Sequence, residues 1–180
     1  MNSTGDGMRS WATAAAAMAA LAAGRAEAAI ERPSPTGFTA VETAHIAAAP
    51  DRVFAVLIQP ARWWSSVHTF SGSAANLRLD ARAGGCWCET LPDGGSAEHL
   101  RVVYVAPGKT LRLVGGLGPL QPMPVQGVLT FSLAPAGGGT DVKLTYALAG
   151  PAGLGDLAGP VDRVLGEQVA GLKAAAEATR

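Results

Sequence analysis

Hydrophobic and polar residues alternate along most of the chain from residue 76 onward, and a period of two is typical of β-strands. In residues 129–133 and 142–148, large apolar side chains occupy one face while Thr, Ser and Lys occupy the other. Further strands are expected at residues 77–80, at 82–101 as two strands around a Gly-rich turn, at 102–105 and at 110–114, and a strand with weaker alternation at 38–46. The pattern therefore predicts six or seven antiparallel strands, several of them with one buried and one solvated face.

Helical spacing occurs on both sides of this strand-rich region. Residues 159–178 carry apolar side chains three and four positions apart, and Pro160 stands where the first turn of a helix tolerates proline. Pro50 opens a short helix, and a second short helical turn is expected at residues 61–66. We expect an α+β fold in which a curved antiparallel sheet wraps around one long C-terminal helix. The two short helices would close one end and leave a pocket between sheet and helix.

The first 28 residues carry the features of a secretory signal. Arg9 precedes an apolar run at residues 12–23, and residues 26–28 read Ala-Glu-Ala, a small-x-small cleavage site. The run is shorter than the roughly 20 residues that span a bilayer, so no stable membrane span is expected. We expect residues 1–28 to be a signal peptide, residues 29–37 a Pro-rich linker, and the mature protein to be periplasmic or secreted by a bacterium. The alternative is an Ala-rich surface helix or a disordered tail.

Composition limits the function classes. Acidic and basic residues number 14 each, and no basic block occurs, so nucleic acid is not an expected partner. With 48% hydrophobic residues, the chain can bury the core of one domain. It contains no Gly-rich phosphate loop, no G-x-S-x-G elbow and no H-E-x-x-H motif, so we expect no cofactor. The sequence leaves a homo-oligomer open.

The segment at residues 82–101 carries the most chemically suggestive side chains. A Pro-Asp-Gly-Gly-Ser turn joins its two strands, and Trp87 and Glu89 share one face of the first. Beside an indole in an apolar pocket, Glu89 could act as a general acid or base with a raised pKa. The alternative is a carboxylate that pairs with Arg101 or His99.

The register of the hairpin determines whether Glu89 lies opposite His99. A three-residue turn at residues 93–95 would set Glu89 opposite His99, whereas a two-residue turn at residues 94–95 would set it opposite Leu100. Only the first register is expected to give a Glu–His pair.

Cys86 and Cys88 lie on the other face of the same strand. Thiols of exported proteins are usually paired, but residues two apart on a strand are near the limit of disulfide geometry. They could also bind a soft metal, with His99 as a third ligand if the hairpin register places it on their face. We expect two packed, reduced thiols and no metal.

The order of these elements is shared with a known superfamily. Together with the segments IAAAPDRVFAVL, RAGGCWCE, GGGTDVKLTY and GEQVAGLK and the Pro-Gly-Lys turn, it resembles the START-like (SRPBCC) helix-grip proteins. Within them, it is similar to the polyketide cyclase/dehydrase and activator-of-heat-shock-protein-ATPase-like branch. The likeness covers residues 38–178 and implies the helix-grip fold. Members bind lipids, hormones or polyketides, cyclise polyketides, hydrolyse, or have no known reaction, so the resemblance does not imply one activity.

We therefore expect a small hydrophobic or amphipathic molecule in the cavity between sheet and helix, with the loop at residues 115–124 as a lip. The residues expected to contact this ligand are Trp63, Trp64, His68, Trp87, Glu89, Leu113, Phe131, Leu144, Tyr146 and Leu165. Trp63 and Trp64 could offer their indole N–H groups to the ligand or pack in the core. His68 could contact the ligand, or be a loop histidine hydrogen-bonded to the backbone.

Two other functions remain open. The first is a cavity enzyme of the cyclase, dehydratase or hydrolase type, in which Glu89 moves protons and His68 or His99 assists. The second is a chaperone-interaction module, as the branch name suggests.

Overall fold

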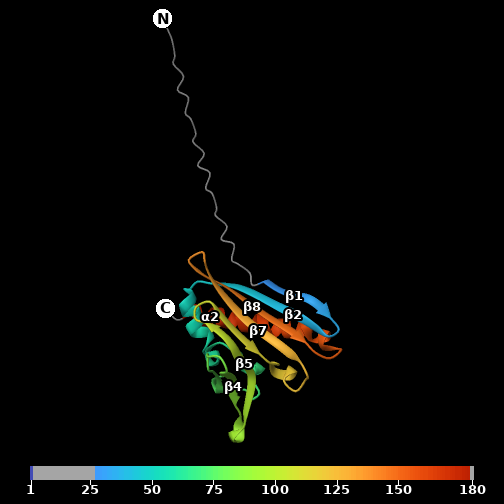
Figure 1. The fold of residues 1–180 in the computed structure, drawn as a ribbon. Coiled ribbons are helices and arrows are strands. Elements are labelled where there is room, and N and C mark those ends of the chain that lie inside the picture. Colours follow the sequence, from blue (N-terminus) through green and yellow to red (C-terminus); the bar gives the residue numbers. More distant parts are fainter. Residues whose placement is uncertain (2–26, 179–180) are drawn as a thin grey trace.

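The fold is that of a computed structural model, which describes residue 1 and residues 27–178. An eight-stranded antiparallel sheet in the order β1-β2-β8-β7-β6-β5-β4-β3 packs against the long helix α2 (Figure 1). The strands are β1 (Glu27–Ser34), β2 (Gly37–Ile46), β3 (Leu77–Leu79), β4 (Cys86–Thr90), β5 (Ser96–Ala106), β6 (Thr110–Val114), β7 (Gln126–Ala136) and β8 (Gly139–Ala149). The α-helices are α1 (Pro50–Leu57) and α2 (Ala158–Ala178). This α+β, helix-grip-like arrangement confirms the predicted fold class.

Single 3-10 turns occupy several of the connections. They are η1 (Pro60–Arg62), η2 (Ser66–His68), η3 (Ala74–Asn76), η4 (Pro92–Gly94), η5 (Gly118–Leu120) and η6 (Leu154–Leu157). The second short helix predicted at residues 61–66 is thus replaced by η1 and η2. Trp63 interrupts it with a φ of −138°, outside the helical region.

The eighth strand, β1, lies where a linker was expected. It pairs with β2 from Glu27↔Thr43 to Glu31↔Thr39, and the register becomes irregular before Ser34. A strand at the edge of a sheet tolerates proline, because one side of its backbone needs no partner, so the Pro-rich composition did not exclude pairing. The predicted signal peptide falls mostly on residues 2–26, which lie outside the described residues.

The core follows the alternation seen in the sequence. On β8, Val142, Leu144, Tyr146 and Leu148 are all buried, and Phe131 of β7 faces Leu144 across the pair. Burial of each such side chain stabilises the fold by roughly 1.5–3 kcal/mol. The buried face of α2 completes this core with Leu165, Val169, Leu172 and Ala176.

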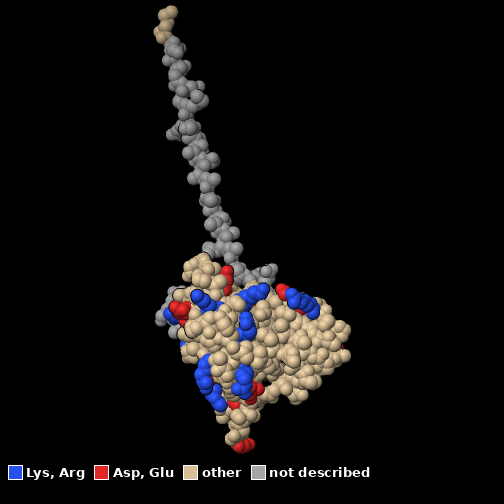
Figure 2. Space-filling model, viewed as in Figure 1, with Lys and Arg blue, Asp and Glu red and all other residues tan. Residues whose placement is uncertain are grey.

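The visible surface carries charges of both signs. Figure 2 shows Lys and Arg interspersed with Asp and Glu on this face, beside a broad area at the right without charged residues. The loop between β6 and β7 is itself free of charge, since residues 115–125 read GGLGPLQPMPV. Among the described residues, no helix is both long and apolar enough to cross a membrane.

Candidate functional site

A cavity of about 300 Å³ lies between the first half of α2, one end of the sheet and two loops. This volume is at the lower end of the range found for small-molecule sites. The lining residues are Trp64, Val67, His68, Thr69, Phe70, Leu77, Trp87, His99, Leu117, Gly118, Pro119, Leu120, Tyr146, Leu157, Pro160, Val161, Val164 and Leu165. Most of these side chains are apolar, so the cavity suits a molecule with a hydrophobic body.

Five of the ten predicted ligand contacts line this cavity. They are Trp64, His68, Trp87, Tyr146 and Leu165. The other five, Trp63, Glu89, Leu113, Phe131 and Leu144, are buried but do not line it. Alternation along a strand shows which face a residue occupies but not how far along the strand a cavity extends, and this cavity occupies only one end of the sheet.

Sequence reasoning missed part of the wall. The loop at residues 115–124, expected as a lip, does contribute through Leu117 to Leu120. Val161 and Val164 continue the apolar face of α2 that contains Leu165, so helical spacing was a signal for them. Val67 and Phe70 had no such signal, because they lie in an irregular segment and remain exposed.

Glu89 is fully buried directly behind this wall. Its carboxylate accepts hydrogen bonds from the backbone N–H groups of Phe70 (3.0 Å) and Ser71 (2.5 Å) and from His99 Nε2 (2.8 Å). Burial raises the pKa of Glu89, but hydrogen bonds from Ser71, Phe70 and His99 outweigh it and hold the pKa below its ordinary value. The expected raised pKa is therefore wrong, and Glu89 is a carboxylate at neutral pH.

A β-bulge brings His99 to Glu89. The observed register pairs Glu89 with Ala97 and Trp87 with Leu100, so neither predicted register is correct. The ladder shifts between Trp87 and Cys88, which leaves His99 as the extra residue on β5. As a result, His99 and Leu100 are both buried although they are neighbours in sequence. The Glu–His pair forms, but through the bulge and not through the turn.

His99 is the member of this pair that reaches the cavity. Its imidazole is only 6% exposed, lines the cavity and stacks on Phe70 with a centroid distance of 5.3 Å and an interplanar angle of 16°. Because a carboxylate can only accept, Nε2 carries the proton that Glu89 binds. The carboxylate of Glu89, itself held by two backbone N–H groups, and the ring of Phe70 together fix the orientation of the His99 imidazole.

His68 and the two adjacent tryptophans are engaged within the protein. Nε2 of His68 lies 2.9 Å from the carboxylate of Glu167, so the expected backbone partner is wrong. The indole of Trp64 donates to the carbonyl oxygen of His68, and that of Trp63 donates to the carbonyl oxygen of Leu57. Neither indole N–H is therefore offered to a ligand.

Tyr146 fixes the lip of the cavity. Its hydroxyl donates to the carbonyl oxygen of Gly115 (2.8 Å) and accepts from the N–H of Leu117 (3.0 Å). Burial raises the pKa of Tyr146 to about 12, so the hydroxyl keeps its proton. Tyr146 thus holds the loop in place, and its ring faces the cavity.

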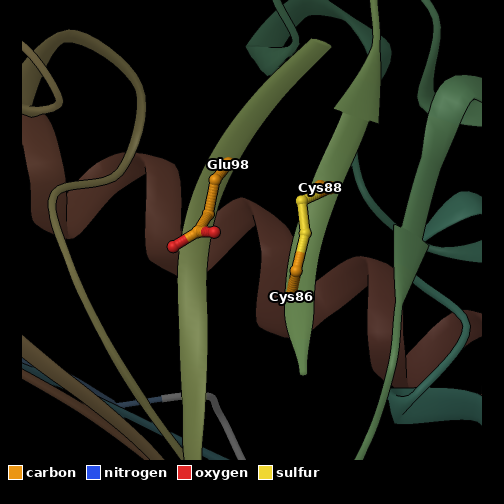
Figure 3. Close-up of side chains that lie close together, drawn as sticks. All are labelled: Cys86, Cys88 and Glu98. Carbon is orange, nitrogen blue, oxygen red and sulfur yellow. A yellow bond between two sulfur atoms is a disulfide. The ribbon is translucent and has the colours of Figure 1, made fainter. Parts of the chain in front are cut away.

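Cys86 and Cys88 form a disulfide on the opposite face of β4 (Figure 3). Their Cα atoms are 5.4 Å apart, within the range that a disulfide bridges, so the expectation of reduced thiols is wrong. Glu98, their neighbour on β5, points toward the sulfurs, and its carboxylate also pairs with Arg101. His99 faces the cavity instead, so it is not the third ligand of a metal site with these cysteines. While the disulfide is intact, neither sulfur is the thiolate that a soft metal needs.

The comparison with protein families is decisive. Residues 37–177 match the family described as polyketide cyclase / dehydrase and lipid transport. The chain belongs to this family. The match covers most of the chain and confirms the SRPBCC resemblance. Proteins of this family typically bind hydrophobic ligands in a cavity.

Solved structures of this polyketide cyclase/dehydrase-type fold support the same architecture. MLL2253 from Mesorhizobium loti has a TM-score of 0.59 at 20% identity, covering 79% of this chain and 98% of its own. A protein from Rhizobium leguminosarum has a TM-score of 0.58 at 21% identity, covering 86% and 97%. CalU16 from Micromonospora echinospora has a TM-score of 0.54 at 17% identity, covering 83% and 87%. At these identities the likeness shows the fold alone, and a search of curated proteins found no match.

Proposed function

We propose that the chain binds a small hydrophobic or amphipathic molecule in the cavity between α2 and the sheet. The observation that carries this proposal is the apolar cavity itself, about 300 Å³ in volume and framed by Trp87, Tyr146 and Leu165. A well-formed apolar pocket with few polar groups is the usual form of a small-molecule site. The cavity also favours binding over a chaperone-interaction module, which would not require a hollow interior.

A cavity-filling variant tests this proposal. Val164 lines the cavity from α2, so Val164→Trp would place an indole where the ligand is expected. Val103 lies on the exposed side of β5 and does not line the cavity, so Val103→Trp is the matched control. The probe is N-phenyl-1-naphthylamine, whose fluorescence rises in apolar surroundings. We expect Val164→Trp to lower its affinity at least tenfold and Val103→Trp to leave it unchanged. Equal binding by all three proteins would contradict the proposal.

Export is part of the proposal. It is supported by the apolar run at residues 12–23 and the Ala-Glu-Ala cleavage site in the sequence, and by the disulfide between Cys86 and Cys88. Disulfides persist mainly in oxidising compartments such as the periplasm. The test is the intact mass of the protein from the periplasmic fraction of its own bacterium. A mass that still includes residues 1–28, or recovery in the cytoplasm, would contradict export.

The Glu89–His99 pair favours a second candidate, an enzyme that uses the cavity. A carboxylate that orients an imidazole is the arrangement of a general base, and the imidazole is the group that would touch a substrate. The reaction would begin when His99 takes a proton from the bound molecule, with Glu89 as the positioning residue.

Deuterium exchange at carbon 1 of 2-tetralone tests this second candidate in D2O. We expect the wild type to accelerate the exchange and His99→Phe to abolish the acceleration. Exchange at the buffer rate in the wild type would refute this use of the dyad and leave ligand binding intact.

A further inference from the structure

The polar groups of the cavity wall differ in whether they are already satisfied. The hydroxyl of Tyr146 has both a donor and an acceptor partner, and the hydroxyl of Thr69 donates to the carbonyl oxygen of Ser66. The indole N–H of Trp64 donates to a backbone carbonyl. These two hydroxyl groups and the indole N–H already donate their protons within the protein, so they do not donate to a ligand.

Each of the two histidines in the cavity wall has one ring nitrogen that makes no hydrogen bond within the described part of the chain. Nε2 of His68 pairs with Glu167 and Nε2 of His99 pairs with Glu89, and no hydrogen bond to either Nδ1 occurs in the described part of the chain. The two pairs differ in solvation. The side chains of His68 and Glu167 are 28% and 52% exposed, whereas those of His99 and Glu89 are 6% and 0% exposed.

The environment of Glu89 determines the character of His99 Nδ1. Glu89 accepts two backbone N–H groups as well as Nε2–H, and these bonds keep it ionised. The proton of a neutral His99 is therefore on Nε2, and Nδ1 is left as an acceptor with a lone pair. His99 lines the cavity and is only 6% exposed, so a ligand that donates a hydrogen bond to Nδ1 gains affinity. Water competes for this nitrogen less at His99 than at the more exposed His68.

We propose that the ligand is a hydrophobic molecule with a hydroxyl group, an enol, phenol or alcohol, that donates a hydrogen bond to Nδ1 of His99. The inference rests on the proposed binding function and names the chemical class that the site selects. Its apolar body would lie against Trp87, Val164 and Leu165, and its hydroxyl would point toward β5. Phe70 stacks on His99 and holds the ring at the angle at which it meets the ligand.

A matched pair of probes isolates this hydrogen bond. 2-Naphthol and 2-methoxynaphthalene have the same bicyclic body, and both have an oxygen that can accept, but only naphthol can donate. Their affinities are measured by competition against N-phenyl-1-naphthylamine at about pH 7. We expect the wild type to bind 2-naphthol about tenfold more tightly than the ether, since one additional hydrogen bond in a poorly solvated site is worth about that factor.

Two variants assign the preference to one histidine. His99→Phe removes the acceptor and should bind both probes equally, while His68→Phe should keep most of the preference because His68 is solvated. His99→Phe leaves Glu89 buried with one donor fewer, so its folding is checked by circular dichroism. A measurement without mutation accompanies it: the ¹⁵N resonance of His99 Nδ1 in the wild type should shift when 2-naphthol is added and stay in place with the ether.

The outcomes separate this inference from the proposed function. Equal affinity of the wild type for both probes, or an unchanged Nδ1 resonance on saturation with 2-naphthol, would overturn the hydroxyl proposal while cavity binding stands. A preference that survives in His99→Phe would also overturn it. If neither probe nor the fluorophore binds the wild type, the proposed function fails and the inference fails with it.

Discussion

Replacing Glu42 by glutamine should change how the stability of the protein depends on pH. Glu42 lies on the inner face of β2, is 1% exposed, and faces α2 at Asp162 and Gly166. Gly166 lies beside the carboxyl group, and a Cβ built there would make an ordinary van der Waals contact of 3.5 Å with its oxygens. Burial, and secondarily the negative charge of Asp162, raise the pKa of Glu42 from 4.5 to about 7. The carboxyl group is thus held as a neutral acid against α2 over much of the acidic range.

The direction in which the folding stability changes with pH follows from proton linkage. Between about pH 4.5 and 7 the folded state holds a proton that the unfolded state releases, so the stability from this group is complete below about pH 4.5 and is lost as pH rises to 7. A shift of this size corresponds to about 3 kcal/mol. Glutamine cannot ionise, and its amide can donate to the Oδ1 atom of Asp162, which has no partner among the described residues. At pH 8, Glu42→Gln should therefore be more stable than the wild type by up to about 3 kcal/mol.

Urea unfolding from pH 4.5 to 8 measures this effect in the wild type, in Glu42→Gln and in the control Glu31→Gln. Glu31 is an exposed carboxylate on β1, so Glu31→Gln makes the same chemical change at a solvated position. The free energies of unfolding of wild type and Glu42→Gln should be close at pH 4.5 and diverge as the pH rises. A difference that is the same at both ends of the range, or that appears equally in Glu31→Gln, would refute the reasoning.

Three further predictions concern the disulfide, the lip of the cavity and Glu89. In urea unfolding, the double variant Cys86→Ala, Cys88→Ala should have a free energy of unfolding about 1.5 kcal/mol below that of the wild type; this loss is small because the disulfide closes a very short loop. Dithiothreitol should lower the free energy of unfolding of the wild type by the same amount. Tyr146→Phe should speed hydrogen exchange of the Leu117 amide, which mass spectrometry would detect; unchanged exchange would show that the loop is held by other contacts. The lowered pKa of Glu89 contributes stability above about pH 4.5 that is lost as pH falls. Glu89→Gln should therefore make the free energy of unfolding fall less steeply as the pH is lowered below about 4.5. Equal slopes in the variant and the wild type would contradict this.

The fold was predictable because burial and periodicity agree over long segments. On β7 and β8 the apolar residues of one face alternate with polar residues of the other, and every predicted inner residue from Leu129 to Leu148 is buried. The apolar positions of α2 likewise face the sheet. The strand β1 escaped prediction because its pairing depends on an edge position, and no local pattern reveals which edge of a sheet is free.

The site was less predictable because it depends on irregular backbone. The Glu–His pair requires the bulge at His99, which inserts one residue into a ladder that period-two reasoning treats as regular. The pKa of Glu89 was given the wrong direction because the decisive donors, Phe70 and Ser71, come from a loop 19 and 18 residues earlier in the chain. Trp87 and His99 line the cavity and Glu89 lies behind its wall, and these positions follow from contacts that the sequence pattern does not encode.

Occupation of the cavity by a hydrophobic molecule is tested by native mass spectrometry of the wild type and of Val164→Trp, both purified from the organism that produces the protein. We expect an additional small-molecule mass on the wild type, extractable into organic solvent, and none on Val164→Trp, where the indole fills the space beside Leu165. A wild type that carries no such mass, or a variant that carries the same mass at the same occupancy, would contradict the account.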